Sequence, residues 1–380
     1  MSLMNNPAFM ARLKEKMDQA QAEKDTRKFD AAEISAKIKK RVIGQDLIAD
    51  QIAQFVARKA ARRVKKGTLG NILISGPTGT GKSEMSKAIS EACFGSEDFM
   101  LQIDCGNLGT GESALASLIG ANQVYSGSSR GVISDYLLKT RGEGVILFDE
   151  YEKAAPTKDA PIGKMLLKLL DEGKVQSPYD MSTLDATGCI IILTSNLKQK
   201  ELADIAKKYQ DPEELELACK SVLGDSMAPE FLERLDLVTT TKPLTQEGMA
   251  RIVMLHFEKI AASHEISVVD TGEGFWDLLL EGAERFGATS TRGVIRWLGK
   301  VCDDPMIEAV NDRRWKRVIA DYRDGELILS NADAARTAQA EAPRMAAPAP
   351  APAAETPKPA QAAPVRPRPA VKDDDREGFY

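Results

Sequence analysis

A glycine-rich stretch, GPTGTGKS at residues 76–83, constrains the fold of this chain more than any other feature. It matches the phosphate-binding loop pattern, because the first glycine is followed by four residues and then by Gly-Lys-Ser. The apolar run 71–75 precedes it and a helical pattern over 84–92 follows, which is the strand–loop–helix context that the pattern requires. We therefore predict a nucleotide site. Its lining residues would be Gly76, Pro77, Thr78, Gly79, Thr80, Gly81, Lys82 and Ser83.

The chemistry of this loop is specific. Glycines let the backbone turn tightly, so that successive N–H groups can face a phosphate, and the start of the following helix adds partial positive charge. Lys82 would bring a full charge to the β- and γ-phosphates, and the Ser83 hydroxyl would reach Mg²⁺. ATP and Mg²⁺ are therefore the predicted cofactors.

A second sequence feature, VILFDE at residues 145–150, places two carboxylates directly after a short apolar run. Such a run predicts a buried strand, and ligands of open α/β sheets bind at the carboxyl ends of the strands. Asp149 would hold Mg²⁺ together with Ser83, and Glu150 would polarise the attacking water. Because this feature follows the loop by about 65 residues, it strengthens the prediction of ATP hydrolysis.

Composition narrows the class of protein. The 380 residues carry a net charge of −5, with 43% hydrophobic and 28% charged residues, which is typical of a soluble globular protein of two or three units. The slight acidity argues against nucleic acid as the main partner. Five scattered cysteines and only two histidines predict no metal site other than that for Mg²⁺. No apolar run is long enough for a membrane span and the N-terminus lacks a signal core, so we expect a cytoplasmic location.

The chain divides by its patterns. Short apolar strands at 71–75, 100–104, 145–148, 189–194 and 236–240 alternate with helical patterns and predict a five-stranded, mostly parallel α/β sheet. Helical patterns follow at 246–262, 275–286 and 292–310, before two short strands joined by Asp324-Gly325. Nine of the 18 prolines lie between residues 343 and 369, which predicts a disordered tail. The predicted units are 1–40, an N-terminal helical extension; 41–242, the α/β unit; 243–330, a small helical unit; and 331–380, the tail.

Two charged stretches leave their function open. Residues 1–40 are helical in pattern, and Asp30 followed by Glu33 is typical of a helix start. This extension could recruit a partner, or its helices could pack on their own domain. The basic run between Arg58 and Lys66 is either a solvated helix face or, less typically, a nucleic-acid patch.

Several motifs in order resemble the AAA+ ATPases of the Clp unfoldase group, in particular the second ATPase module of ClpB-like proteins and ClpX. The similarity runs from about Arg41 to Leu329. The matching stretches are RVIGQD at 41–46, GPTGTGKS at 76–83, LFDEYEKA at 147–154, LLKLLDEGKV at 166–175, IILTSN at 191–196 and APEFLERLD at 228–236. The resemblance implies a P-loop NTPase module followed by a small helical lid.

The resemblance also implies roles for single residues. Val42 and Ile43 would lie near the adenine, and Asn196 would act as the polar sensor of the γ-phosphate or the attacking water. Arg234 would be the finger arginine that reaches the nucleotide of a neighbouring subunit; the alternative is a local salt bridge with Glu230 or Asp236. Arg292 would be the second sensor, with Arg296 as the alternative.

A loop after LIGA at 118–121 is similar to the substrate-gripping pore loop of the family and places Tyr125 at its aromatic position. An aromatic side chain can grip an extended chain without reading its sequence. Val124 and Ser126 depart from the family pattern, which puts processive threading in question. No hydrophobic-Gly-Phe/Leu tripeptide occurs in 197–224, so we expect no dedicated ClpP-like protease partner.

Together these features predict an ATP-driven motor that remodels or unfolds proteins. We expect a homo-oligomeric ring, a hexamer, with ATP hydrolysed between subunits, and a protein substrate or adaptor recruited by residues 1–40 or by the tail. Two alternatives remain: a nucleic-acid remodeller or loader, and a slow ATPase scaffold in a larger assembly.

Overall fold

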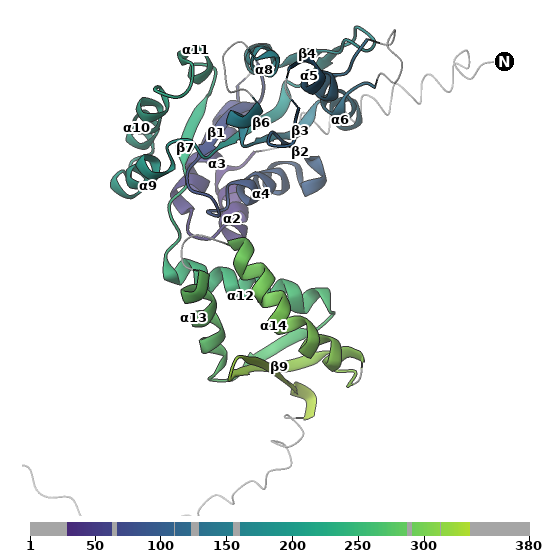
Figure 1. The fold of residues 1–380 in the computed structure, drawn as a ribbon, viewed down its shortest axis with the longest axis vertical. Coiled ribbons are helices and arrows are strands. Elements are labelled where there is room, and N and C mark those ends of the chain that lie inside the picture. Colours follow the sequence, from purple (N-terminus) through teal and green to yellow (C-terminus); the bar gives the residue numbers. More distant parts are fainter. Residues whose placement is uncertain are drawn as a thin grey trace, which may run out of the picture. The chain divides into compact units, whose positions relative to one another are not determined.

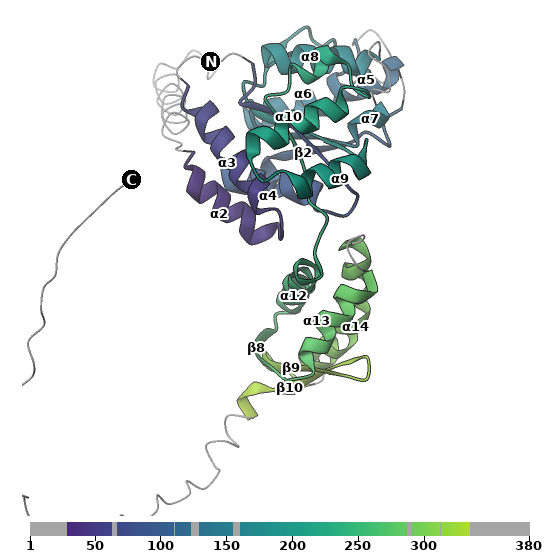
Figure 2. The same ribbon diagram turned by 90° about the vertical axis from the view of Figure 1, so that its left-hand side faces the viewer.

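The computed structural model describes residues 29–62, 67–109, 111–122, 129–154, 160–286, 291–311 and 313–334 (Figures 1 and 2). The predictions for residues 1–28, for the basic residues 63–66, for Tyr125 and for the tail from residue 335 lie outside these ranges. The described residues up to Asp333 belong to one compact unit.

The described residues contain a five-stranded sheet in the order β2-β3-β6-β1-β7 (Figure 1). Its strands are β1 Gly70–Ser75, β2 Met100–Asp104, β3 Glu143–Asp149, β6 Gly188–Ser195 and β7 Leu237–Thr240. Every neighbouring pair is parallel, so the predicted sheet is confirmed, and the predicted strand ends agree with the structure to within two residues. Because the strands are parallel, all their carboxyl ends lie at one edge of the sheet.

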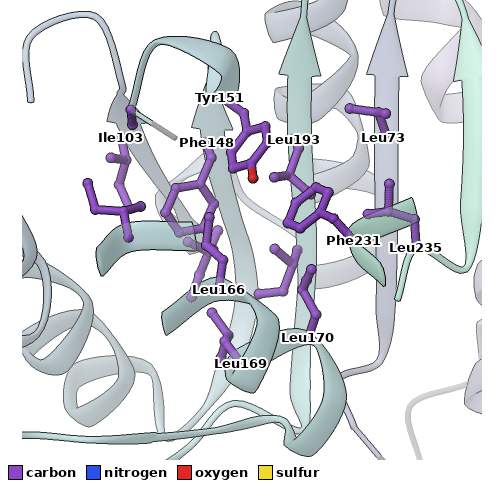
Figure 3. Close-up of a cluster of buried hydrophobic side chains, with 14 of the residues drawn as sticks. Leu73, Ile103, Phe148, Tyr151, Leu166, Leu169, Leu170, Leu193, Phe231 and Leu235 are labelled. Atoms are coloured by element: carbon purple, nitrogen blue, oxygen red, sulfur yellow. The ribbon is translucent and has the colours of Figure 1, made fainter. Parts of the chain in front are cut away.

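Both faces of the sheet are covered by helices, as expected for a parallel sheet. Along β1, Ile72 and Ile74 belong to one hydrophobic cluster and Leu73 to the other. The first cluster packs under α2 (Ala31–Arg41), α3 (Asp46–Ala60) and α4 (Lys82–Phe94). The second cluster, part of which is drawn in Figure 3, packs under α5 Gly111–Ile119, α6 Val132–Thr140, α7 Tyr151–Ala154, α8 Pro161–Glu172, α9 Gln199–Lys208, α10 Pro212–Leu223 and α11 Pro229–Leu232.

Helix α2 belongs to the packed core of the α/β unit. Its N-cap is Asp30, whose carboxylate accepts a hydrogen bond from the Glu33 N–H at 2.8 Å, as the sequence predicts. Ile34 and Ile38 are buried against α3 and α4. The predicted boundary at residue 40 therefore cuts through a packed helix, and for α2 the second interpretation, packing on its own domain, applies.

A short antiparallel hairpin precedes β6. Its strands, β4 (Lys174–Gln176) and β5 (Thr183–Asp185), form a separate two-stranded sheet that the sequence patterns do not predict. Val175 and Leu184 anchor it in the same hydrophobic cluster as α8. A 3₁₀ turn at Glu97–Phe99 leads into β2.

The C-terminal part of the described chain has its own core and is less purely helical than predicted. Helices α12 (Gln246–Ser263), α13 (Phe275–Phe286) and α14 (Thr291–Asn311) match the predicted helices closely. They pack with a three-stranded sheet of order β10-β9-β8, whose strands are β8 Ser267–Thr271, β9 Arg317–Arg323 and β10 Glu326–Asn331.

The turn between β9 and β10 is the predicted one: Asp324 and Gly325 have φ angles of 54° and 86°, as a tight hairpin turn requires. Strand β8 was not predicted. The predicted boundary at 330/331 falls inside β10, and Asp333 beyond it pairs with Arg317 at 2.9 Å. Among the described helices, none combines the length and the apolar character needed to cross a membrane.

Candidate active site

The stretch 76–83 joins the carboxyl end of β1 to the first turn of α4. Gly76, Gly79 and Gly81 adopt positive φ angles of 125°, 77° and 93°. At Gly76 a Cβ atom would collide with the side chain of Thr241, which follows β7. Only glycine fits there, so this close approach of two chain segments explains the first glycine of the pattern.

Polar contacts hold the loop from two sides. The Thr80 hydroxyl donates to the Pro77 carbonyl oxygen at 2.8 Å and shares a 2.6 Å hydrogen bond with the Thr241 hydroxyl. The Gln45 side-chain amide donates to the carbonyl oxygens of Thr80, at 3.4 Å, and Lys242, at 2.8 Å. Gln45 was not among the predicted site residues, although it belongs to the RVIGQD motif.

Of the residues predicted near the adenine, Val42 lies beside the loop: it is buried, and a Cβ at Gly81 would lie 3.6 Å from Val42 Cγ1. Ile43 packs instead against the core of the C-terminal helices. Thr78 is exposed. These positions surround the loop, but the adenine contacts themselves stay a prediction.

Lys82 lies in the middle of the site with only 8% of its surface exposed. Its ammonium group donates to the carbonyl oxygens of Gly76 and Pro77 and to Asn196 Oδ1, each at 2.8 Å. Burial lowers the pKa of Lys82 to about 8, while the nearby carboxylates of Asp149, Glu152 and Glu150 act in the opposite direction. A buried ammonium group is less well solvated than one in water, which favours its pairing with a polyanionic ligand.

Asp149 ends β3 and receives donors from three neighbouring elements. Its Oδ2 accepts from the Ser83 hydroxyl at 3.1 Å and from Gln102 Nε2 at 3.2 Å, and its Oδ1 accepts from the Thr194 hydroxyl. The carboxylate and the Ser83 hydroxyl are hard oxygen donors that lie side by side, which suits Mg²⁺. Gln102 and Thr194 were not predicted; Gln102 lies in the middle of β2 and Thr194 near the carboxyl end of β6, the two strands next to β3.

Glu150 and Asn196 form a direct pair. Glu150 has a φ of 56°, and its N–H donates to the Thr194 hydroxyl at 3.0 Å. Asn196 Nδ2 donates to Glu150 Oε1 at 3.0 Å, while Asn196 Oδ1 accepts from Lys82. Since an ammonium group can only donate, this contact fixes which end of the amide faces Glu150. The Asn196 N–H in turn donates to Glu152 Oε1 at 3.0 Å. The predicted residues of the loop, β3 and β6 thus form one network.

Known proteins match this architecture. Residues 67–238 match the family model described as AAA domain (Cdc48 subfamily). The chaperone protein ClpB of Aquifex aeolicus is 30% identical over 319 residues, which are 80% of this chain and 31% of that protein. The ATP-dependent Clp protease ATP-binding subunit ClpC of Staphylococcus aureus is 30% identical over 321 residues, 80% of this chain and 38% of ClpC.

This chain thus contains an AAA domain over residues 67–238 and is similar over 80% of its length to AAA+ ATPases of the Clp group. It spans about a third of the length of these curated relatives. Two solved structures share the fold: Hsp104 with ATPγS and FITC casein in a closed state, and the extended Hsp104–casein complex of S. cerevisiae. The first has a TM-score of 0.61 at 21% identity and covers 79% of this chain and 51% of its own. The second has a TM-score of 0.65 at 20% identity, and the match covers 80% of this chain and 53% of that Hsp104 chain.

In this AAA+ module Arg234 lies at the opposite edge of the sheet from the phosphate-binding loop. Its carbonyl oxygen accepts from the side chain of Asn71, which lies at the amino end of β1, whereas the loop follows the carboxyl end of that strand. A strand of this length spans about 20 Å. Arg234 is therefore far from the nucleotide residues of its own chain.

The local salt bridge proposed for Arg234 has a different partner from those expected. The guanidinium lies 3.6 Å from Asp171, and both side chains are nearly half exposed. Asp236 instead pairs with Lys59 at 2.5 Å. Lys59 is therefore engaged within the fold and does not belong to an open basic patch.

The two arginines predicted as alternative sensors are both exposed on α14. Thr291, which precedes Arg292, donates through its hydroxyl to the Gly79 carbonyl oxygen at 3.4 Å. This contact brings the start of α14 to the phosphate-binding loop. Arg292 is one residue from it and Arg296 is more than a turn further along, so the contact favours Arg292.

Proposed function

We propose that this AAA+ module is an ATP-driven protein-remodelling motor that acts as a ring, with ATP hydrolysed at the interfaces between subunits. The observation that carries the proposal is the separation of the two half-sites. Lys82, Glu150 and Asn196 form one connected network at the carboxyl edge of the sheet, whereas Arg234 is exposed at the amino edge. A site that needs both halves requires a second copy of the chain, and we expect the ring to be a hexamer.

At each interface the residues would have distinct tasks. Lys82 and the N–H groups of the loop would bind the β- and γ-phosphates. Ser83 and Asp149 would hold Mg²⁺, which neutralises phosphate charge when bound, in part through water. Arg292 and the residues around Val42 would complete the nucleotide contacts.

The hydrolytic step would depend on three further groups. Glu150 would polarise the attacking water, and Asn196 would orient that water or the γ-phosphate. Arg234 of a neighbouring copy would stabilise the charge of the transition state, because its planar guanidinium can bind two phosphate oxygens at once. An arginine supplied in this way is worth about 10³-fold or more in rate.

A protein is the substrate that we propose. Relatives of this chain include a chaperone, and the similar Hsp104 structures contain casein. Tyr125 would contact the substrate in the ring pore, since an aromatic ring can hold many sequences. Residues 1–28 or the segment after residue 334 would recruit the substrate or an adaptor, and a dedicated ClpP-like protease is not expected.

The decisive experiment uses Glu150→Gln, which keeps the shape of the side chain but removes the carboxylate. We expect this variant to bind ATP, to lose phosphate release, and to stay assembled as a ring in size-exclusion chromatography with light scattering. A variant that binds ATP but remains monomeric would contradict the ring. Pull-downs with the trapped variant, with and without residues 335–380, would identify the substrate. Tyr125→Ala should then keep basal ATP hydrolysis and lose the remodelling of that substrate.

A further inference from the structure

Lys153, on the short helix α7, contacts the catalytic carboxylate of Glu150 directly. Its ammonium group pairs with Glu150 Oε2, while Glu150 Oε1 accepts from Asn196 Nδ2 at 3.0 Å. Each oxygen of the carboxylate is thus held by a donor from a different element, one from α7 and one from the end of β6. Two independent donors fix the plane of a carboxylate, whereas a single donor leaves it free to rotate about that contact.

The stem of Lys153 takes a defined path across the turn that follows β2. A Cβ atom on Gly106 would lie 3.3 Å from Lys153 Cδ and 3.4 Å from Nζ. The same Cβ would lie 3.1 Å from Asp104 Oδ1, which accepts from the Gly106 N–H at 2.8 Å. The absence of a side chain at Gly106 therefore provides the space in which Lys153 lies between the carboxylates of Glu150 and Asp104.

The charges around Lys153 favour its cationic form. The hydrogen bond with Glu150 raises the pKa of Lys153 most, and the charges of Glu150, Asp104 and Glu152 act in the same direction. Lys153 thus balances negative charge on one side of the site, as Lys82 does on the other.

If Lys153 served only to stabilise the fold, its contribution to the free energy of unfolding would be small. The side chains of Lys153 and Glu150 are 54% and 33% exposed, and ion pairs this open to solvent contribute little to folding stability. Removing the ammonium group should therefore leave the fold intact, and any large effect would come from the orientation of Glu150.

We propose that Lys153 is a positioning residue for ATP hydrolysis: it holds Glu150 Oε2 so that, together with Asn196, it orients the carboxylate toward the attacking water. The inference rests on the proposed function, in which Glu150 polarises that water. It assigns Lys153 to the hydrolytic step and not to the binding of ATP, because no described contact joins Lys153 to the phosphate-binding loop.

The test is a steady-state comparison of Lys153→Met and Lys153→Arg with the wild-type chain, by phosphate release over a range of ATP concentrations. We expect Lys153→Met to lower kcat by about 10- to 100-fold, the loss typical of a misplaced catalytic group, with KM for ATP changed less than about twofold. Lys153→Arg keeps the charge and should recover most of the rate. Gly106→Ala, which crowds the Lys153 stem from the other side, should lower kcat in the same direction but by less.

Lys220→Met is the matched control, because Lys220 forms a similar helix ion pair with Glu216 at 2.6 Å on α10. It should leave both kinetic constants unchanged. Suppose that the wild-type chain hydrolyses ATP and Glu150→Gln does not, so that the proposed function stands. An unchanged or higher kcat in Lys153→Met, or a higher KM with the same kcat, would then overturn the role of Lys153 and leave the proposed function intact. A wild-type chain without ATP hydrolysis would overturn the proposed function and this inference with it.

Discussion

The two edges of the central sheet carry opposite kinds of polar structure. At the carboxyl edge, Lys82 donates to Asn196 and Ser83 donates to Asp149, and Lys82 is almost completely buried. At the amino edge, the buried side chain of Asn71 binds two backbone carbonyl oxygens and the Thr68 hydroxyl, and Arg234 is exposed beside it. The first edge is organised to receive a ligand within the chain. At the second edge, the buried contacts of Asn71 fix the backbone at Arg234, whose side chain is exposed.

The largest expected effect comes from breaking the carboxyl edge at Lys82. Lys82→Met removes the charge for the phosphates and leaves the Asn196 oxygen without its donor. We expect ATP hydrolysis to fall by about 10³-fold or more, and ATP binding to weaken strongly. Titration with a fluorescent ATP analogue and phosphate release would measure both. Lys87→Met, which changes a partly exposed lysine on the same helix, is the control and should behave like the wild-type chain.

The next effect tests whether the amino edge completes a site in another chain. Arg234→Ala should lower hydrolysis by about 10²- to 10³-fold while ATP binding is nearly retained, because Arg234 lies far from its own loop. Arg58→Ala, which also removes an exposed arginine, should leave hydrolysis unchanged.

Mixing two inactive variants sharpens the comparison of the edges. In mixed rings an Arg234→Ala subunit retains Glu150, and a neighbouring Glu150→Gln subunit supplies Arg234, so that some interfaces contain both groups. We expect partial recovery of hydrolysis on mixing, measured as phosphate release against the mole fraction of each variant. If mixing never exceeds the sum of the two separate activities, Arg234 does not act between subunits.

A smaller effect, on folding, is expected at Asn71. Its Oδ1 accepts from the Thr68 hydroxyl at 2.6 Å, and its Nδ2 donates to the carbonyl oxygens of Leu170 and Arg234, both at 3.0 Å. Asn71→Ala leaves these buried groups without partners, which should cost about 2–3 kcal/mol in the free energy of unfolding. Urea denaturation would measure it. The exposed Asn311 offers a control, since Asn311→Ala should change stability by less than about 0.5 kcal/mol.

The same contrast explains what sequence patterns predict and what they miss. The loop at 76–83 and the carboxylates at 149–150 are contiguous and follow apolar runs, so their place at one edge could be predicted from local signals. Gln102 and Thr194 join that site only because parallel pairing places β2 and β6 on either side of β3, and nothing local marks them.

At the amino edge, the alternative considered for Arg234, a salt bridge with Glu230 or Asp236, names the wrong partners because it considers only residues near in sequence. The partner, Asp171, comes from the end of α8, and Asp236 pairs with Lys59. The three-residue strands β4 and β5 are too short to show a period, and β8 pairs in parallel with β9, about fifty residues further along the chain. Such non-local contacts leave no pattern in a single stretch of sequence.

The smallest expected effect concerns the contact that joins the two edges through the core. Tyr151 follows Glu150, and its ring stacks on Phe231, three residues before Arg234, with centroids 4.6 Å apart and planes inclined by 3° (Figure 3). Both rings are buried. Each of Tyr151→Leu and Phe231→Leu should lower the free energy of unfolding, and the double-mutant cycle should give a coupling of about 0.5–1.5 kcal/mol. If this ring contact also couples the position of Glu150 to that of Arg234, Tyr151→Leu should lower kcat with little change in KM. A variant that loses stability but keeps kcat would show that the two edges are held in register by the sheet and not by this aromatic pair.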